Sequence, residues 1–369
     1  MLSFNVAKSE LLPRLLIVSG AVDKRQSLAI LANILLRLEN NQLTMIATDL
    51  EMEIASSLPC SFEAPLSELT VPAKKFIDII RSFDDDVAPT ISLQANTVLI
   101  KSGRSQFKLA TLPADQFPAC NQEQSEYQFS ISRAALIHLF QSTHFAMSQQ
   151  DVRIFLNGLL FNVDKSLITS VATDGHRMAI CKLECDTGIS DQRFLLPKKG
   201  IQEMLRLLNS IEDEMVTVLA GKSHFRLNTS VYSFTSKLIE ARYPPYAKAI
   251  PVDNDKFVLI EKEPLKRALS RIIILAHEKS RAVLMHVQPG AGLTLIANNQ
   301  EQEEASEQLE AQVDGGELKI GINASYLLDV LNIISDTHIR LSMSNTDRSI
   351  LVESLSDEYY QYIIMPMKL

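Results

Sequence analysis

The 369-residue sequence has few of the residues that mark several common protein classes. It contains no tryptophan and only 6% aromatic residues, whereas proteins that grip single-stranded nucleic acid use aromatic side chains as stacking platforms. Its four cysteines form no Cys-x-x-Cys pair, which argues against a disulfide framework or a zinc site and favours a reducing compartment. No apolar run reaches the roughly 18 residues that a membrane span needs, and the N-terminus is a poor secretion signal. We therefore expect a cytoplasmic protein that binds no metal and no membrane.

Sequence motifs of common enzymes are also missing. Gly221-Lys222-Ser223 lacks the earlier glycine of a phosphate-binding loop, and there is no Gly-x-Gly-x-x-Gly, Gly-x-Ser-x-Gly or His-Glu-x-x-His segment. One pair could still act in catalysis, because Asp174 and His176 could form a general base and its orienting partner. The alternative is a turn between two strands, which Asp-Gly favours. We expect no enzymatic activity and no cofactor, with catalysis at Asp174 and His176 as a rival hypothesis.

The sequence does contain a repeat with a long period. Thr48, Thr173 and Asn298 lie in similar segments at a constant spacing of 125 residues, and Val71-Pro72 recurs at the same spacing as Leu196-Pro197. A constant spacing indicates a repeated unit, and this one has the length of a domain rather than of a solenoid repeat. The sequence predicts three tandem domains, at residues 1–125, 126–252 and 253–369.

Each copy has the same expected secondary structure, in which two helices lie among antiparallel strands. Alternating residues from Leu2 to Val6 predict a half-buried strand, and an apolar stripe behind Ser9 predicts the first helix. Pro72 then suits the start of the second helix. The helices expected in the other copies are Ser132 to about Met147, Pro197–Leu208, Pro264–Ala276 and Ala324–Ile334. The expected fold class is α+β, and the acidic run Glu301–Glu310 lies outside the predicted strands.

Charge is distributed unevenly over this plan. The formal net charge of −8 argues against nucleic acid, because nucleic-acid-binding domains are expected to be basic. Lys74 and Arg81, however, are seven residues apart on one helix face, and Lys199 and Arg206 repeat that spacing in the next copy. For any single pair, a solvated helix face is the alternative. Its repetition predicts one positive surface within an acidic protein.

The repeated segments together resemble one known family, the bacterial sliding clamps, which are the beta subunits of DNA polymerase III. The likeness runs from end to end and rests on Ala-Thr-Asp-Leu-Glu-Met (47–52), Val-Pro-Ala-Lys-Lys-Phe (71–76), Ser-Gly-Arg-Ser (102–105), Gln-Asp-Val-Arg (150–153), Val-Ala-Thr-Asp-Gly-His-Arg (171–177), Phe-Thr-Ser-Lys-Leu (234–238), Ala-Asn-Asn-Gln-Glu-Gln-Glu-Glu-Ala (297–305) and Met-Pro-Met-Lys-Leu (365–369). The resemblance implies a DNA polymerase processivity factor without catalytic activity. Two copies of three clamp domains would close head to tail into a homodimeric ring around double-stranded DNA.

In such a ring, basic helices face the hole and contact phosphates, which carry no sequence information. The contacts are expected to be loose, so that the ring can slide along the duplex. The DNA-binding residues that the resemblance implies are Lys24, Arg25, Lys74, Lys75, Arg81, Gln150, Lys198, Lys199, Arg206, Lys266 and Arg267. An open binder of single-stranded nucleic acid is the rival interpretation of the basic residues.

The resemblance also implies two protein interfaces. At the dimer seam, Lys75, Lys101, Arg104 and Phe107 would meet Ile274, Leu275, Glu301, Glu303 and Glu304 of a second copy. A pocket between the second and third domains would bind short linear peptides of the DNA polymerase III alpha subunit, the clamp loader, other DNA polymerases and repair proteins. The implied pocket residues are Arg153, Leu156, Thr173, Gly175, His176, Arg177, Met178, Pro244, Asn323, Tyr326, Ser349, Ile363, Ile364, Met365, Pro366, Met367 and Leu369. The residues alone leave an alternative open, in which Ile363–Met367 are only the core residues of an edge strand.

Overall fold

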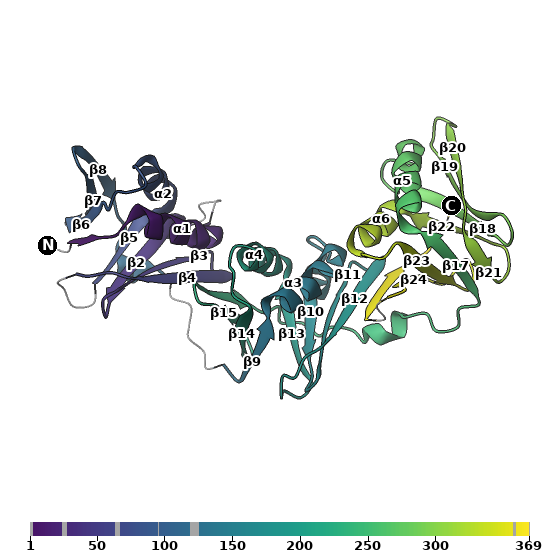
Figure 1. Ribbon diagram of the computed structural model, residues 1–369, viewed down its shortest axis with the longest axis horizontal. Coiled ribbons are helices and arrows are strands. Elements are labelled where there is room, and N and C mark those ends of the chain that lie inside the picture. Colours follow the sequence, from purple (N-terminus) through teal and green to yellow (C-terminus); the bar gives the residue numbers. More distant parts are fainter. Residues whose placement is uncertain are drawn as a thin grey trace. The chain divides into compact units, whose positions relative to one another are not determined.

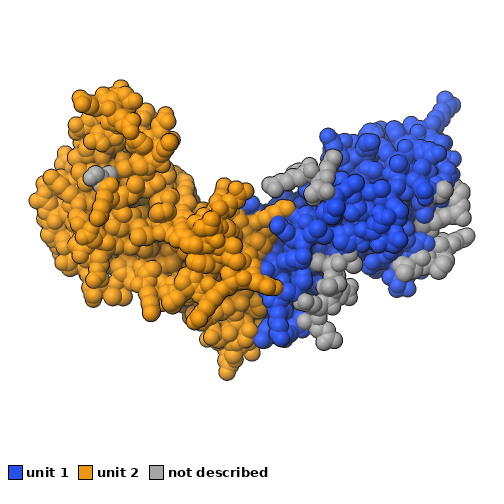
Figure 2. Space-filling view, turned by 180° about the vertical axis from the view of Figure 1, so that it is seen from behind, with its two compact units in different colours: residues 1–134, 202–238 blue, residues 135–201, 239–369 orange. Residues whose placement is uncertain are grey.

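Antiparallel strands dominate the computed structural model, which describes residues 3–23, 28–62, 67–94, 96–118, 125–356 and 359–368. The chain forms two units, residues 1–134 with 202–238 (unit 1) and residues 135–201 with 239–369 (unit 2), which Figure 2 colours blue and orange. The division falls within two helices of the second copy, α3 (Arg133–Gln141) and α4 (Lys198–Leu208). The second copy therefore contributes strands to both units.

Unit 1 contains an eight-stranded sheet, in the order β5-β2-β3-β4-β16-β15-β14-β9, and a four-stranded sheet, in the order β1-β6-β7-β8 (Figure 1). Helix α1 packs against helix α2 and against strands β3 and β4. The elements are β1 (Ser3–Asn5), α1 (Lys8–Val18), β2 (Asn33–Glu39), β3 (Gln42–Thr48), β4 (Met52–Pro59), β5 (Ser67–Pro72), α2 (Ala73–Ser82), β6 (Thr90–Gln94), β7 (Thr97–Ser102), β8 (Ser105–Ala110), β9 (Tyr127–Ser132), β14 (Met215–Ala220), β15 (His224–Asn228) and β16 (Ser233–Lys237).

Unit 2 repeats this plan with a nine-stranded sheet, in the order β13-β10-β11-β12-β25-β24-β23-β17-β21, and a four-stranded sheet, in the order β20-β19-β18-β22. Helix α5 packs against helix α6 and against strands β19 and β20. The elements are β10 (Gly158–Val163), β11 (Leu167–Thr173), β12 (Arg177–Glu184), β13 (Gln192–Pro197), β17 (Lys256–Glu261), α5 (Lys262–Ile272), β18 (Ala282–Gln288), β19 (Gly292–Asn298), β20 (Glu304–Leu309), β21 (Gln312–Asp314), β22 (Leu318–Asn323), α6 (Ala324–Ile333), β23 (His338–Met343), β24 (Ile350–Ser354) and β25 (Tyr360–Ile364).

The strand registers reproduce the 125-residue spacing of the sequence. Leu35 lies opposite Ile46 in the first copy, and Leu160 lies opposite Val171 in the second. The copies are also joined by equivalent strand pairs, because β4 pairs with β16 in unit 1 and β12 pairs with β25 in unit 2. The predicted α+β repeat of three copies is confirmed, and each large sheet crosses from one copy into the next.

Local sequence patterns account for the helices. On α2, Phe76, Ile77 and Ile80 are buried, whereas Lys74 and Arg81 are exposed, as expected when apolar residues recur every three to four positions. Two predicted boundaries were wrong. The helix expected to reach Met147 ends at Gln141 and is followed by a short 3₁₀ turn, and the helix expected from Pro264 begins two residues earlier and ends at Ile272.

Strand β20 was missed by the sequence analysis, since it lies inside the acidic run Glu301–Glu310. No residue of β20 is buried, so the strand has no apolar alternation to reveal it. Charged side chains suit such a position, because they discourage uncontrolled pairing of an exposed edge. Within the described ranges, no helix combines the length and apolar character that crossing a bilayer requires.

Candidate peptide pocket, basic helices and open sheet edges

The repeated Thr-Asp segment forms a hydrogen-bonded turn between β11 and β12. Thr173 Oγ1 donates to the carbonyl of Arg177 at 2.6 Å and accepts the N–H of Gly175 at 3.1 Å. Asp174 Oδ1 accepts the N–H groups of His176 at 2.9 Å and Arg177 at 3.0 Å. Gly175 has a φ of +87°, a left-handed conformation that glycine adopts at low cost. These residues therefore recur because they build a turn.

The first copy forms the same turn without a histidine. Thr48 Oγ1 donates to the carbonyl of Met52 at 2.8 Å, and Asp49 Oδ1 accepts the N–H groups of Glu51 at 3.0 Å and Met52 at 2.8 Å. In the second copy, the other oxygen of Asp174 accepts from the Arg177 side chain at 3.1 Å. The Asp174 carboxylate is thus engaged by the turn and by an arginine, and the catalytic interpretation of this motif loses its basis.

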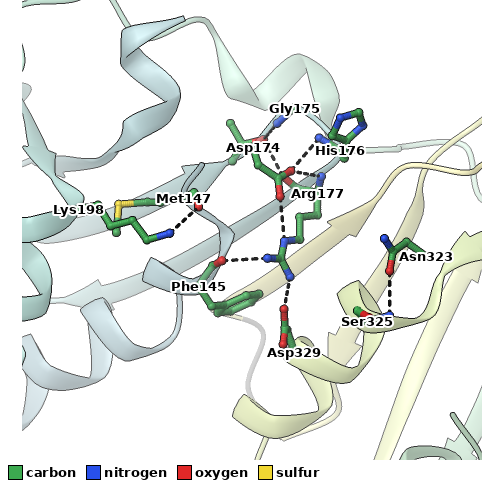
Figure 3. Close-up of polar contacts among 11 residues, drawn as sticks. Phe145, Met147, Asp174, Gly175, His176, Arg177, Lys198, Asn323, Ser325 and Asp329 are labelled. Carbon is green, nitrogen blue, oxygen red and sulfur yellow. Dashed lines mark hydrogen bonds and ion pairs between the residues drawn. The ribbon is translucent and has the colours of Figure 1, made fainter. Parts of the chain in front are cut away.

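Arg177 connects this turn to the third copy, as Figure 3 shows. Its side chain is only 12% exposed. Beyond Asp174, the guanidinium donates to the Phe145 carbonyl at 3.0 Å and forms an ion pair with Asp329 of α6. It also lies 4.5 Å from the ring centroid of Tyr326 and 5.3 Å from that of Phe145, within the range of cation–π attraction. Asp329 was not among the predicted site residues, although α6 carries this acid where α2 and α4 carry spaced cations.

A cavity of about 620 Å³ opens beside the turn in unit 2. Its size is typical of small-ligand pockets. Eight of the predicted pocket residues line it: Thr173, Gly175, Arg177, Met178, Pro244, Ser349, Ile363 and Met365. Met178, Tyr243 and Ile363 belong to the buried apolar cluster beneath it, and burial raises the pKa of the Tyr243 hydroxyl above its usual value. The cavity therefore offers an apolar floor with a polar turn at its rim.

The segment after Pro244 forms much of the remaining cavity wall, which the predicted set did not include. It contributes Pro245, Tyr246, Lys248, Ala249, Ile250, Pro251 and Val252, and the loop before β24 adds Asp347 and Arg348. Nothing in the local periodicity of a linker indicates that it covers a cavity.

The other predicted pocket residues lie outside this lining. Leu156 and Ile364 are buried at 2% and 1% exposure, and Asn323 accepts the N–H of Ser325 as the N-cap of α6. Met367 donates its N–H to the carbonyl of Gly321 at 2.8 Å. These residues are therefore engaged in the core or in backbone hydrogen bonds rather than in the cavity lining. His176 is exposed, Pro366 is half-buried, and Leu369 lies outside the described residues.

Arg153 approaches the pocket rim from a neighbouring loop. Its Nη2 lies 3.1 Å from the position that a β-carbon on Gly175 would occupy. Its Nε and Nη2 donate to the two oxygens of Asp151 at 3.0 and 2.9 Å. These hydrogen bonds, together with the one that the backbone N–H of Arg153 donates, lower the pKa of Asp151 to about 2. The ion pair therefore holds Arg153 beside the turn at neutral pH.

The predicted DNA-binding residues differ in their exposure and in their contacts. Lys74, Lys75, Lys199 and Arg267 are exposed on helices, Lys266 is half-buried, and Gln150 is exposed with a left-handed φ of +56°. Arg81 pairs with Asp78 at 3.3 Å and Arg206 pairs with Glu203, one turn earlier in each helix. Lys198 donates to the Met147 carbonyl at 3.1 Å (Figure 3), and burial followed by the nearby Arg177 charge lowers its pKa. Lys24 and Arg25 lie outside the described residues.

Two sheet edges carry the predicted seam residues. Strand β8 ends one four-stranded sheet and β20 ends the other. Lys101 and Arg104 are exposed beside β8, where Phe107 packs edge-on against Phe83 with 5.8 Å between ring centroids. Near the other edge, Ile274 is 75% exposed, Leu275 is half-buried, and Glu301, Glu303 and Glu304 are exposed. Across the described part of the chain, no group of His, Cys, Asp and Glu side chains could hold a metal ion.

Comparison with known proteins covers the whole chain. Residues 2–121, 130–245 and 247–368 match the family models for the N-terminal, central and C-terminal domains of the DNA polymerase III beta subunit. The chain is 41% identical to the beta sliding clamp of Vibrio cholerae, with both proteins covered completely. It also superimposes on the crystal structure of the DNA polymerase III subunit beta from Pseudomonas aeruginosa with a TM-score of 0.96, at 39% identity and complete coverage of both chains. A second structure from that organism, a sliding clamp bound to griselimycin, matches with a TM-score of 0.94 and 40% identity, again over the full length of both chains. The chain therefore belongs to the beta sliding clamp family, the non-catalytic processivity factors of DNA polymerase III.

Proposed function

We propose that two copies of this chain close head to tail into a ring around double-stranded DNA, with clamp domains at residues 1–125, 126–252 and 253–369. The observation that carries this proposal is the pairing of repeat-equivalent strands. The fourth strand of one copy pairs with the last strand of the next, as β4 with β16 and β12 with β25. Among the described strands, β20 is the fourth strand of the third copy and β8 is the last strand of the first copy, and each has an open edge. A second copy would supply the missing partner for each, as two-fold symmetry requires.

The seam is tested by placing a charge in its apolar part. Ile274→Asp puts a carboxylate where the partner's apolar side chains would exclude water, which is costly without a counter-charge. Light scattering is expected to show a monomer for this variant and a dimer for the parent protein. Met215→Asp is the control, because Met215 is also exposed, at 54%, but lies on β14, which belongs to neither four-stranded sheet. A dimeric Ile274→Asp variant would contradict the proposed seam.

The cations on one side of α2, α4 and α5 are the proposed inner wall of the ring. Lys74, Lys75, Lys199, Lys266 and Arg267 would contact phosphates, while Lys24, Arg25, Arg81, Gln150, Lys198 and Arg206 complete the proposed set. After loading by a clamp loader, the protein should stay on nicked circular DNA and leave the same DNA once it is cut. Arg267→Glu is expected to slow loading and to make its salt dependence shallower, because fewer counterions are released when one phosphate contact is lost. Arg193→Glu, which alters an exposed pair on β13, is the control, and equal loss from circles and linear DNA would exclude encirclement.

We further propose that the unit 2 cavity binds short linear peptides of the DNA polymerase III alpha subunit, the clamp loader, other DNA polymerases and repair proteins. Its apolar floor and polar rim suit an extended peptide with apolar side chains, because flexible methionine and aliphatic residues adapt to several partners. A related clamp from Pseudomonas aeruginosa binds griselimycin. The cytoplasm is the inferred location, since these partners act on replicating DNA.

The peptide site is tested with Met365→Glu. Met365 lines the cavity and is 48% exposed, so the charge should repel an apolar ligand without disturbing the core. The affinity for a dye-labelled pentapeptide ending in leucine and phenylalanine should fall at least tenfold, and polymerase stimulation should fall with it. Leu355→Glu, at a residue of 52% exposure outside this cavity, should change neither. Unaltered binding by Met365→Glu would rule out the cavity as the docking site.

A further inference from the structure

A second cavity, of about 580 Å³, lies on the equivalent face of the large sheet in unit 1. The strand registers show the equivalence. In unit 2, Met178 lies opposite Ile363, which lies opposite Leu351 on the next strand. In unit 1, the same three places on β4, β16 and β15 hold Glu53, Thr235 and Arg226. The chain thus contains the peptide-pocket scaffold twice, once at each junction between copies.

Equivalent strand residues lie beside the two cavities. Leu35 and Ile46 stand where unit 2 has Leu160 and Val171, and Phe117 packs on them as Tyr243 packs on its own cluster. A proline follows each aromatic residue and lines each cavity. The strand framework and the aromatic–proline pair are therefore present in unit 1.

The floors of the cavities differ. Met178, Ile363 and Leu351 are members of one buried apolar cluster. In unit 1 the Arg226 Nε donates to the Thr235 hydroxyl at 3.0 Å, Thr235 is 3% exposed, and the Glu53 side chain lines the same cavity. An apolar anchor seated here would remove water from a carboxylate and a guanidinium and offer no hydrogen bond in return, which is strongly unfavourable.

We propose that Glu53, Thr235 and Arg226 are specificity determinants, which restrict peptide docking to one of the two equivalent junctions in each chain. This inference rests on the proposed peptide function of the unit 2 cavity. It assigns the difference between a binding and a non-binding junction to three neighbouring positions on adjacent strands rather than to the strand pairing, which is the same at the two sites.

The test transfers the unit 2 floor to unit 1 through the triple variant Glu53→Met, Thr235→Ile and Arg226→Leu. Titration calorimetry with the leucine–phenylalanine pentapeptide should give one peptide per chain for the parent protein and two for the variant. A variant that still binds one peptide overturns the inference. A parent protein that binds none refutes the proposed function of the unit 2 cavity instead, so the two failures are distinguishable.

Two further variants guard against a misfolded triple variant and against a general charge effect. The double variant Glu53→Met with Arg226→Leu keeps the uncharged Thr235 and should also bind a second peptide. The matched control is Arg37→Leu with Glu68→Met, which removes an ion pair with a 2.6 Å contact from the same cavity but leaves the three floor residues intact. It should bind one peptide, and a second peptide on this control would contradict the assignment to the floor.

Discussion

Replacing Arg177 by alanine should weaken unit 2 far more than replacing an exposed arginine. The substitution removes the guanidinium that joins the turn after β11 to helix α6. It leaves the Asp174 and Asp329 carboxylates without their shared cation. It also deprives the Phe145 carbonyl of its donor and the Tyr326 ring of its cationic neighbour.

The magnitude follows from burial. Removing one partner of a fully buried ion pair costs about 3–5 kcal/mol. The Arg177 and Asp174 side chains are 12% and 15% exposed, but Asp329 is 43% exposed and regains water more readily. We therefore expect a loss of about 3 kcal/mol, at the lower end of that range. For a unit of this size, about 2–4 °C per kcal/mol lowers the melting temperature of unit 2 by about 6–12 °C.

Scanning calorimetry measures this change, with Arg193→Ala as the matched control. The ion pair of Arg193 with Asp191 has side chains that are 65% and 67% exposed, and such surface pairs contribute only about 0–1 kcal/mol. Asp329→Asn should give a smaller loss than Arg177→Ala, and adding it to Arg177→Ala should cost little more, because the two residues form one interaction. If Arg177→Ala melted within 1 °C of the parent protein, on the order of the control, the cluster would not join the two copies as argued.

Three other changes have defined outcomes. Gly292→Ala should destabilise the β18–β19 hairpin more than Gly290→Ala in thermal melts. Both glycines have a positive φ, but only at Gly292 would the new β-carbon meet a backbone carbonyl, at 2.4 Å. Equal losses of stability would show that backbone conformation alone matters. Asp151→Asn should reduce the dependence of the melting temperature on pH under acidic conditions. Hydrogen bonds with Arg153 lower the pKa of Asp151 to about 2. The stabilisation that the Asp151 carboxylate contributes is therefore complete above about pH 4 and is lost as the pH falls towards 2. Identical acid profiles for the variant and the parent protein would contradict this. Tyr243→Phe should leave unfolding in urea unchanged or raise the free energy of unfolding by up to about 1 kcal/mol, since the buried hydroxyl has no hydrogen-bond partner among the described residues. A clear loss of stability would contradict this.

Features encoded by neighbouring residues could be predicted from the sequence. The turn at Thr173 uses side chains within four residues of one another, and helix α2 is marked by its apolar spacing. The spacing of 125 residues then predicted three copies, because each copy must repeat the same local signals to form the same elements. Eight of the pocket residues that the family resemblance implies line one cavity.

Pairing between copies was decided only by the tertiary structure. Glu53 lies opposite Thr235, and Met178 lies opposite Ile363, on strands separated by more than 180 residues of chain. Local sequence periodicity does not indicate which distant strand a residue will pair with. The same holds for Arg177 with Asp329, for the linker that walls the cavity, and for the edge strand β20. The sequence by itself determined what each copy is, since helices and turns depend on nearby residues. Cross-strand register determined which copies share a sheet and which floor is apolar, because hydrogen bonds between distant strands bring those side chains to one face.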